Sequence, residues 1–163
     1  MAPRRGDFGS WLEGTPGAGE PRRGSALGLP EAGPGAKARL GRRLLALLID
    51  WLLSMAVASL FWRVPGGVGL FGAQPWATLA VFAASTAVFV SLFGYTVGHR
   101  LLGLRVARVV RRDERLEPVP GPPGLLAGAV RTGLLCLVVP AVIWDAAGRG
   151  MHDVVASTVL VRR

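Results

Sequence analysis

One carboxylate stands inside an apolar run that is long enough to cross a membrane. Asp50 is the only charged residue between Leu44 and Trp62, a run of about 19 residues that spans a bilayer core of about 30 Å as a helix. An ionised carboxylate near the centre of such a helix costs about 2.5 to 3.5 kcal/mol, so a partner, a proton or a water-lined cavity must offset that cost. Asp50 is therefore the first candidate functional residue.

Arg131 is the predicted intramembrane partner of Asp50. It lies in a later apolar run, 125–144, and each charge comes six residues after the start of its run. If both runs are helices that enter from the cytoplasm, both charges sit about 9 Å deep. Arg43, two helical turns before Asp50 on the same face, is the more distant alternative. Two interpretations stay open: the Asp50–Arg131 pair fixes helix packing, or it forms a proton or cation relay.

Three apolar segments must position these charges. The chain has 163 residues, of which 51% are hydrophobic and 18% charged, and its apolar residues are gathered into blocks. We predict an all-α membrane protein, a small bundle of about three transmembrane or intramembrane helices at about 44–62, 76–93 and 125–144. Three of the five tryptophans stand at the ends of these blocks, where indole rings favour the headgroup layer: Trp62, Trp76 and Trp144.

The positions of the basic residues predict the orientation. Of the residues that give the net charge of +9, eight precede the first block, one lies between the first and second, and six lie between the second and third. The positive-inside rule then places the amino terminus and the loop 94–124 in the cytoplasm and the turn 63–75 outside. The basic loop should attract anionic lipid headgroups. No aromatic-rich basic surface accompanies the charge, so we expect no nucleic-acid binding.

The segments outside the blocks differ in character. Residues 1–40 are rich in Gly and Pro and predict a disordered, basic cytoplasmic arm. Apolar and β-branched residues in 104–111 and 154–161 predict two short strands, which could pair as a small sheet between the loop and the carboxyl-terminal tail, 148–163.

This pairing conflicts with three complete crossings, which would put the carboxyl end outside. A re-entrant third segment would resolve the conflict, because Pro140 removes a helix hydrogen bond and Gly128 and Gly133 loosen the segment. Three full spans remain the simpler interpretation, and both stay open.

Residues for catalysis or metal binding do not cluster in the sequence. His99 and His152 lack a local ligand pattern, and the lone Cys136 lies in an apolar block. No nucleophile, base and orienting group occur together. We therefore predict no metal site, no cofactor and no enzymatic activity.

Three motifs resemble the RDD family of bacterial membrane proteins, over about residues 41–161. The family's name refers to one arginine and two aspartates, which fall by motif on Arg43, Asp50 and Asp153; Arg42 is an alternative to Arg43, but the seven-residue spacing to Asp50 favours Arg43. Its Gly-Pro-rich arm makes the chain similar to short actinobacterial members. The motifs are Gly41-Arg42-Arg43-Leu44-Leu45-Ala46-Leu47-Leu48-Ile49-Asp50, Thr96-Val97-Gly98-His99-Arg100-Leu101-Leu102-Gly103-Leu104-Arg105-Val106 and Gly148-Arg149-Gly150-Met151-His152-Asp153.

The resemblance implies a multi-pass protein of the bacterial plasma membrane whose molecular role is largely unassigned. One function class is a membrane anchor or assembly factor, in which the charges fix helix packing and the cytoplasmic parts hold lipid or a soluble partner. The other is transport of a small ion or ligand, with Asp50 as the titrating group, Arg131 or Arg43 as counter-charge and Asp153 at the mouth. The chain could also associate with further copies of itself as a homo-oligomer. The secondary candidate residues are Arg42, Asp145, Arg149 and His152.

Overall fold

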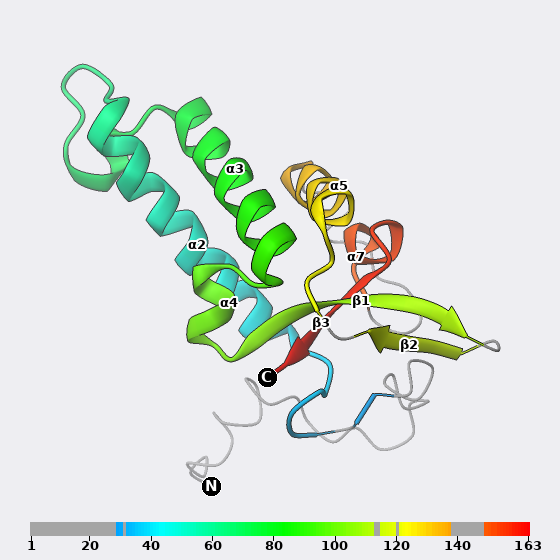
Figure 1. Ribbon diagram of the computed structural model, residues 1–163. Helices are drawn as coiled ribbons and strands as arrows, with labels where there is room; N and C mark the ends of the chain where they lie inside the picture. The colour runs from blue at the N-terminus through cyan, green and yellow to red at the C-terminus, as the bar shows by residue number, and fades with distance from the viewer. Residues whose placement is uncertain (1–28, 31, 113–114, 120, 138–148) are drawn as a thin grey trace, which may run out of the picture.

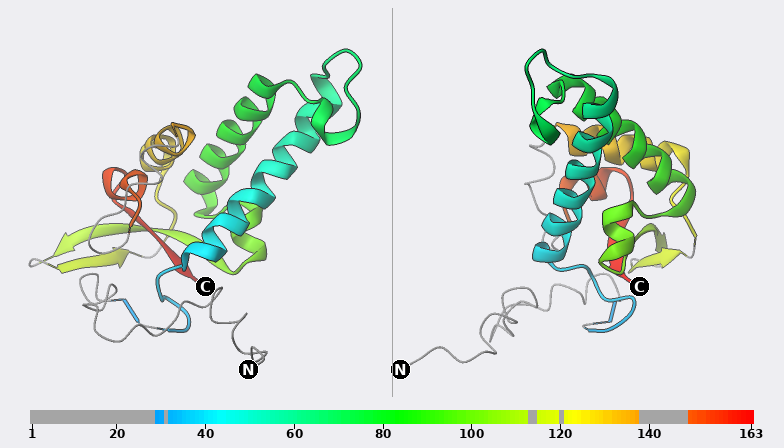
Figure 2. Two further views of the ribbon diagram at one scale, coloured as in Figure 1. Left: turned by 180° about the vertical axis from the view of Figure 1, so that it is seen from behind. Right: turned by 90° about the vertical axis from the view of Figure 1, so that its left-hand side faces the viewer.

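Two long apolar helices, α2 and α3, run side by side in opposite directions (Figures 1 and 2). The computed structural model describes residues 29–30, 32–112, 115–119, 121–137 and 149–163. Helix α2 spans Leu40–Phe61 and α3 spans Pro75–Phe93, where the sequence predicts the first two helices. Both are long and apolar enough to cross a membrane.

The ends of α3 follow from proline and glycine. Pro75 occupies the start of the helix, where its missing N–H would have no partner anyway. At the other end Gly94 adopts φ +76°, a left-handed conformation that ends the helix. Its N–H still donates to the Val90 carbonyl. The turn from α2 to α3 contains a short 3₁₀ helix, η2, at Gly69–Gly72.

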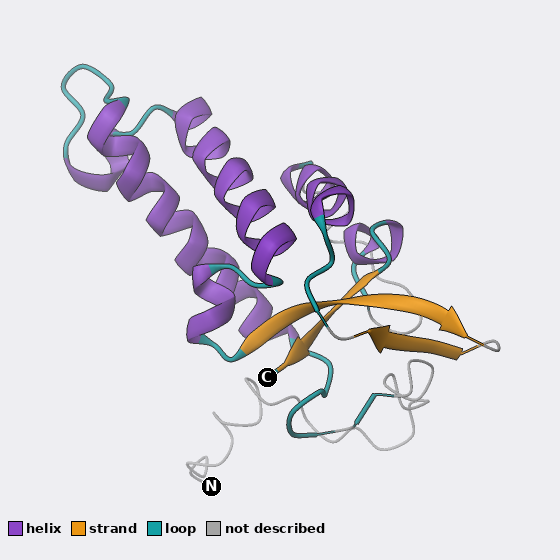
Figure 3. Ribbon diagram, viewed as in Figure 1, coloured by secondary structure: helices purple, strands orange, loops and turns teal. Residues whose placement is uncertain are grey.

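A three-stranded antiparallel sheet lies at one end of the helix pair (Figure 3). After α3, the short helix α4 spans Val97–Leu101 and leads into β1, Leu104–Arg112. Strand β2, Arg115–Val119, pairs with the outer part of β1, and β3, Thr158–Arg162, pairs with the inner part. The predicted pairing of the loop with the carboxyl-terminal tail is confirmed, although β2 was not predicted and the predicted strand 154–161 begins only at Thr158, because residues 154–155 lie in a helix.

The sheet is covered on both faces because its side chains alternate. Leu104, Val106 and Leu160 pack with Ala46 of α2 and Val90 of α3 on the face toward the helices. On the opposite face, a second buried cluster contains the following residues: Leu29, Ala107, Val109, Val159 and Val161. Leu29 comes from the segment before α2, so this segment is part of the core.

The last part of the predicted disordered arm, 1–40, is ordered on the sheet. The Gly35 N–H donates to the Arg162 carbonyl at 2.9 Å, and the Ala38 N–H donates to the Leu160 carbonyl at 2.8 Å. Lys37 bridges Val161 in the antiparallel sense. This segment pairs with β3 because β3 otherwise presents an unpaired edge to solvent. The prediction is wrong for these residues, and most of the arm lies outside the described residues.

The predicted third helix, 125–144, is described only in its first part. Helix α5 spans Leu125–Cys136, about 18 Å at 1.5 Å per residue, which is too short to cross a bilayer core. It packs against the end of α3 so closely that a Cβ on Gly128 would overlap the Ser91 side chain. Residues 138–148 lie outside the described part, so a bundle of three long helices is not confirmed. The short helix α7, Met151–Val155, follows and leads into β3.

Candidate functional site

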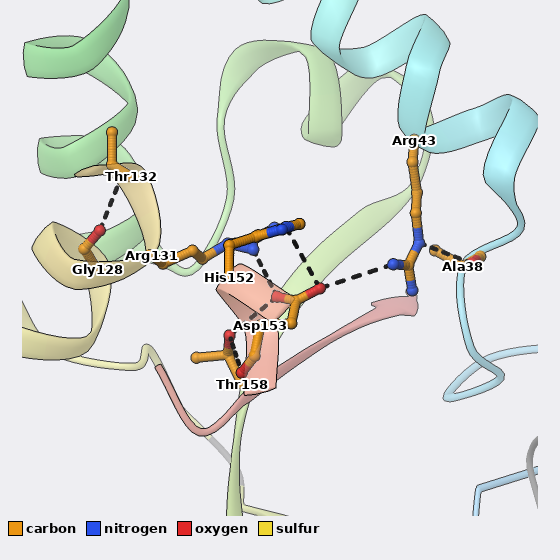
Figure 4. Close-up of polar contacts among 8 residues, drawn as sticks. All are labelled: Ala38, Arg43, Gly128, Arg131, Thr132, His152, Asp153 and Thr158. Atoms are coloured by element: carbon orange, nitrogen blue, oxygen red, sulfur yellow. Dashed lines mark hydrogen bonds and ion pairs between the residues drawn. The ribbon is translucent and has the colours of Figure 1, made fainter. Parts of the chain in front are cut away.

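Asp153 is fully buried at the junction of four elements (Figure 4). Its Oδ1 accepts a hydrogen bond from Arg131 Nη1 of α5 at 2.5 Å and one from the Thr158 hydroxyl of β3 at 2.9 Å. Its Oδ2 lies 3.6 Å from Arg43 Nη1 of α2 and 3.6 Å from His152 Nε2. One carboxylate on α7 therefore joins α2, α5 and β3.

Asp153 is held in its ionised form. Burial alone raises the pKa of this carboxyl, but the positive charges of Arg131 and Arg43, the neighbouring His152 and the Thr158 hydroxyl together lower its pKa below the ordinary value. Removal of the Asp153 carboxylate would leave two buried guanidiniums without this counter-charge, and removal of Arg131 would leave the buried carboxylate without its shortest ion pair. The carboxylate and the two guanidiniums therefore depend on one another.

Asp50 makes a second, separate contact, with the start of α4. Its Oδ1 accepts the Gly98 N–H at 2.8 Å, and its Oδ2 accepts the Thr96 hydroxyl at 2.5 Å. The two bonds use both carboxylate oxygens. They require a close approach of the helices, since a Cβ on Gly98 would overlap the carbonyl oxygen of Ala46. Glycine at this position lets α4 lie directly on α2.

The predicted pair of Asp50 with Arg131 is therefore wrong. The pairing rested on equal depths in two straight spans, whereas the short α5 packs on α3 and α7 and turns Arg131 toward Asp153. Asp50 instead accepts hydrogen bonds from the Thr96 hydroxyl, just before α4, and from the Gly98 N–H within α4. Each carboxylate thus has its own set of partners.

His99 supports the Asp50 contact as a neutral side chain. Its Nδ1 accepts the Thr96 N–H, while the Thr96 hydroxyl accepts the His99 N–H, so the pair forms a reciprocal cap on α4. Burial, followed by the positive charge of Arg131, lowers the pKa of His99 to about 3. A neutral imidazole can accept at Nδ1 only with its proton on Nε2.

The neighbouring arginines have different roles. Arg43 Nε also donates to the Ala38 carbonyl at 2.9 Å, which fixes the segment before α2. Arg42 lies outside the Asp153 cluster, and its Nη1 is 3.4 Å from the Leu102 carbonyl oxygen. The spacing argument that favours Arg43 over Arg42 thus agrees with the geometry, because Arg43 is the one that faces Asp153.

The other predicted residues fall into two groups. Arg149 and His152 are buried, and His152 borders the Asp153 carboxylate. Asp145 lies outside the described residues. Sequence reasoning missed the roles of Thr96, Gly98 and Thr158; a threonine just before a short helix is a recognisable cap signal, but the partner of its hydroxyl is not.

A family model described as the RDD family matches residues 37–157, which is most of the chain. The chain belongs to the RDD family. The residues that the motifs align with the family's name are the three that organise the two contacts described above: Arg43 and Asp153 in one, Asp50 in the other. Membership in the RDD family and the two long apolar helices together point to a membrane protein.

No curated protein and no solved structure matches this RDD protein. Within the described part of the chain, no group of three or more His, Cys, Asp or Glu side chains is placed to hold a metal ion. The contacts at the site are ion pairs and charge-assisted hydrogen bonds between elements distant in the sequence.

Proposed function

We propose that this RDD protein is a non-enzymatic, multi-pass plasma-membrane anchor that holds a cytoplasmic platform against anionic lipid. The platform is defined as α4, α7 and the three-stranded sheet. In this proposal α2 and α3 cross the membrane, and the Asp50 and Asp153 contacts clamp the platform to the cytoplasmic end of α2. The observation that carries the proposal is that both contacts join α2 to platform elements.

The exposed surfaces of α2 and α3 support their insertion in lipid. Large apolar side chains point outward along both helices, for example Leu60 at 74% and Phe61 at 71% exposure. A helix in the core of a water-soluble domain would bury such side chains. At the end far from the platform, Trp62 and Trp76 stack edge to face with ring centroids 6.1 Å apart, as suits an interfacial aromatic belt.

The distribution of charge supports a cytoplasmic platform. The turn between α2 and α3 carries Arg63 as its one charged side chain. Exposed arginines stand on the platform instead: Arg100, Arg105, Arg108 and Arg163. Positive charge of this kind is retained on the cytoplasmic side and attracts anionic headgroups.

The same geometry supports two crossings and a re-entrant or surface position for α5. The hydrogen bonds between the segment before α2 and strand β3 support a topology in which the two ends of the RDD region lie on one side of the membrane. Reporter fusions test this topology. Alkaline phosphatase inserted at Gly66 should be active, and the same enzyme fused after Arg163 should be inactive. Phosphatase activity after Arg163 would contradict the proposal.

Transport of a small ion or ligand is the second candidate, because Asp50 places a carboxylate within an apolar helix. Proteoliposome flux separates the two functions. Wild-type flux that is lost in Asp50→Asn supports transport, whereas flux absent from both proteins supports the anchor. Binding of a soluble cytoplasmic partner and homo-oligomerisation stay predictions.

A further inference from the structure

A groove of about 290 Å³ lies where the end of α3 meets α4. Its walls are almost entirely apolar, and several of the side chains are exposed, including Phe93 at 53% and Leu101 at 67%. The residues that line it are Phe89, Phe93, Tyr95, Thr96, Val97, Arg100 and Leu101. Phe89 and Phe93 belong to the proposed membrane span, so the groove opens at the level where hydrocarbon gives way to headgroups.

Two guanidiniums converge on one aromatic ring of this groove. The Cζ atom of Arg100 lies 5.6 Å from the Tyr95 ring centroid, and that of Arg163 lies 5.2 Å from it. The Arg163 N–H donates to the Gly103 carbonyl at 2.7 Å, which fixes the end of β3 beside α4. Both arginines are exposed, and no Asp or Glu among the described residues forms an ion pair with either.

Such a pair of cations attracts an anion. Each guanidinium lies within about 6 Å of the Tyr95 ring centroid, so the positive charge beside this ring is doubled, and a phosphate there would accept charge-assisted hydrogen bonds from a guanidinium. A tyrosine with an apolar body and a polar tip is also typical of the headgroup layer. The groove therefore offers an apolar wall and a cationic mouth to the same ligand.

We propose that this groove binds one anionic phospholipid, with an acyl chain along Phe89 and Phe93 and the phosphate at Arg100, beside the Tyr95 ring that Arg163 also contacts. The site goes beyond a general attraction of basic surface to lipid, because it predicts a specific place and a one-to-one ratio. It rests on the proposed membrane insertion of α3.

Native mass spectrometry of the full chain, released from detergent with equal amounts of phosphatidylglycerol and phosphatidylcholine, tests the site. The wild type should retain one phosphatidylglycerol in preference. Each of Arg100→Gln and Arg163→Gln should lower the phosphatidylglycerol-to-phosphatidylcholine ratio about fivefold, and the double variant roughly 30-fold. The matched variant Arg63→Gln removes one charge from an exposed position on the turn between α2 and α3, at the end far from the groove, and should leave the ratio within about twofold of the wild type.

Two further arms separate the sources of binding. Phe93→Ala should reduce retention of both lipids, because it shortens the apolar wall that they share. Millimolar inorganic phosphate should not displace the lipid; displacement would show an anion site and overturn the proposal. So would an unchanged lipid ratio in the Arg100→Gln and Arg163→Gln double variant with a wild-type melting temperature. A protein that passes the topology test but shows no lipid preference would overturn this inference alone.

Discussion

The Asp50 carboxylate of α2 accepts the backbone N–H of Gly98 at 2.8 Å, across a contact in which only glycine fits. The first turn of α4 thus lies against α2, and the strand that follows α4 starts from a fixed position. This contact and the Asp153 cluster connect the proposed membrane helices to the sheet.

Gly98→Ala should break the contact between α4 and α2. The added methyl group would overlap the Ala46 carbonyl oxygen and lie 2.9 Å from Asp50 Oδ2, so backbone must move. We expect a loss of about 1 to 3 kcal/mol in the free energy of unfolding, measured by thermal or denaturant unfolding in detergent. Gly133→Ala is the control, because a Cβ at that position would meet no atom of the described residues within 4 Å and alanine favours helix.

Thr96 should be required for its hydroxyl and not for its shape. Thr96→Val removes both the helix cap and the donor to Asp50, with an expected loss of about 2 to 4 kcal/mol in unfolding free energy. Thr96→Ser keeps the hydroxyl and should cost much less. In a double-mutant cycle with Asp50→Asn, the two effects should be less than additive; full additivity would argue that the two side chains do not interact.

Removal of the Asp153 carboxylate should be more harmful than removal of either arginine. Asp153→Asn leaves the Arg131 and Arg43 guanidiniums buried together, with an expected loss of about 3 to 5 kcal/mol in unfolding free energy. Arg131→Met should rank next and Arg43→Met last at about 1 to 3 kcal/mol, because Arg131 lies closer to the carboxylate. Chemical denaturation of the three variants measures this order, and a reversed order would contradict the assigned contacts.

Stability should fall as the pH drops below the ordinary pKa of histidine. The pKa of His99 is about 3 in the folded protein and about 6.5 when unfolded, so between these values the unfolded chain binds the extra proton. Unfolding free energy should fall by about 1.4 kcal/mol per pH unit within that window. His99→Gln keeps an acceptor for the Thr96 N–H and should flatten the profile of melting temperature against pH.

Asp153 should affect the unfolding free energy at lower pH than His99 does. Because its folded pKa is below the ordinary value of 3.8, its contribution is complete above about pH 4 and is lost as the pH falls further. The His99→Gln variant should therefore still lose stability in acid. A variant that stays fully stable far below pH 3.8 would show that the ionised Asp153 does not stabilise the fold.

Local sequence was sufficient for the two long helices and for the β-branched strand after α4, and it singled out Asp50, whereas Arg43 and Asp153 were chosen from the motifs that resemble the RDD family. Hydropathy over a run of residues and alternation within a strand are properties of neighbouring residues, so no tertiary contact is needed to detect them. The pairing of β1 with β3 followed from the same alternation.

Only the tertiary structure decided which charge meets which partner. Matching by depth assumed that 125–144 runs as one straight helix, whereas α5 packs against α3 and α7 returns Asp153 to the Arg131 side chain. Asp50 accepts hydrogen bonds from the Thr96 hydroxyl and the Gly98 N–H, and matching charged residues in the sequence cannot identify such uncharged donors. The order of residues 35–38 likewise depends on the free edge of β3, because an unpaired strand edge takes whichever segment the fold brings beside it.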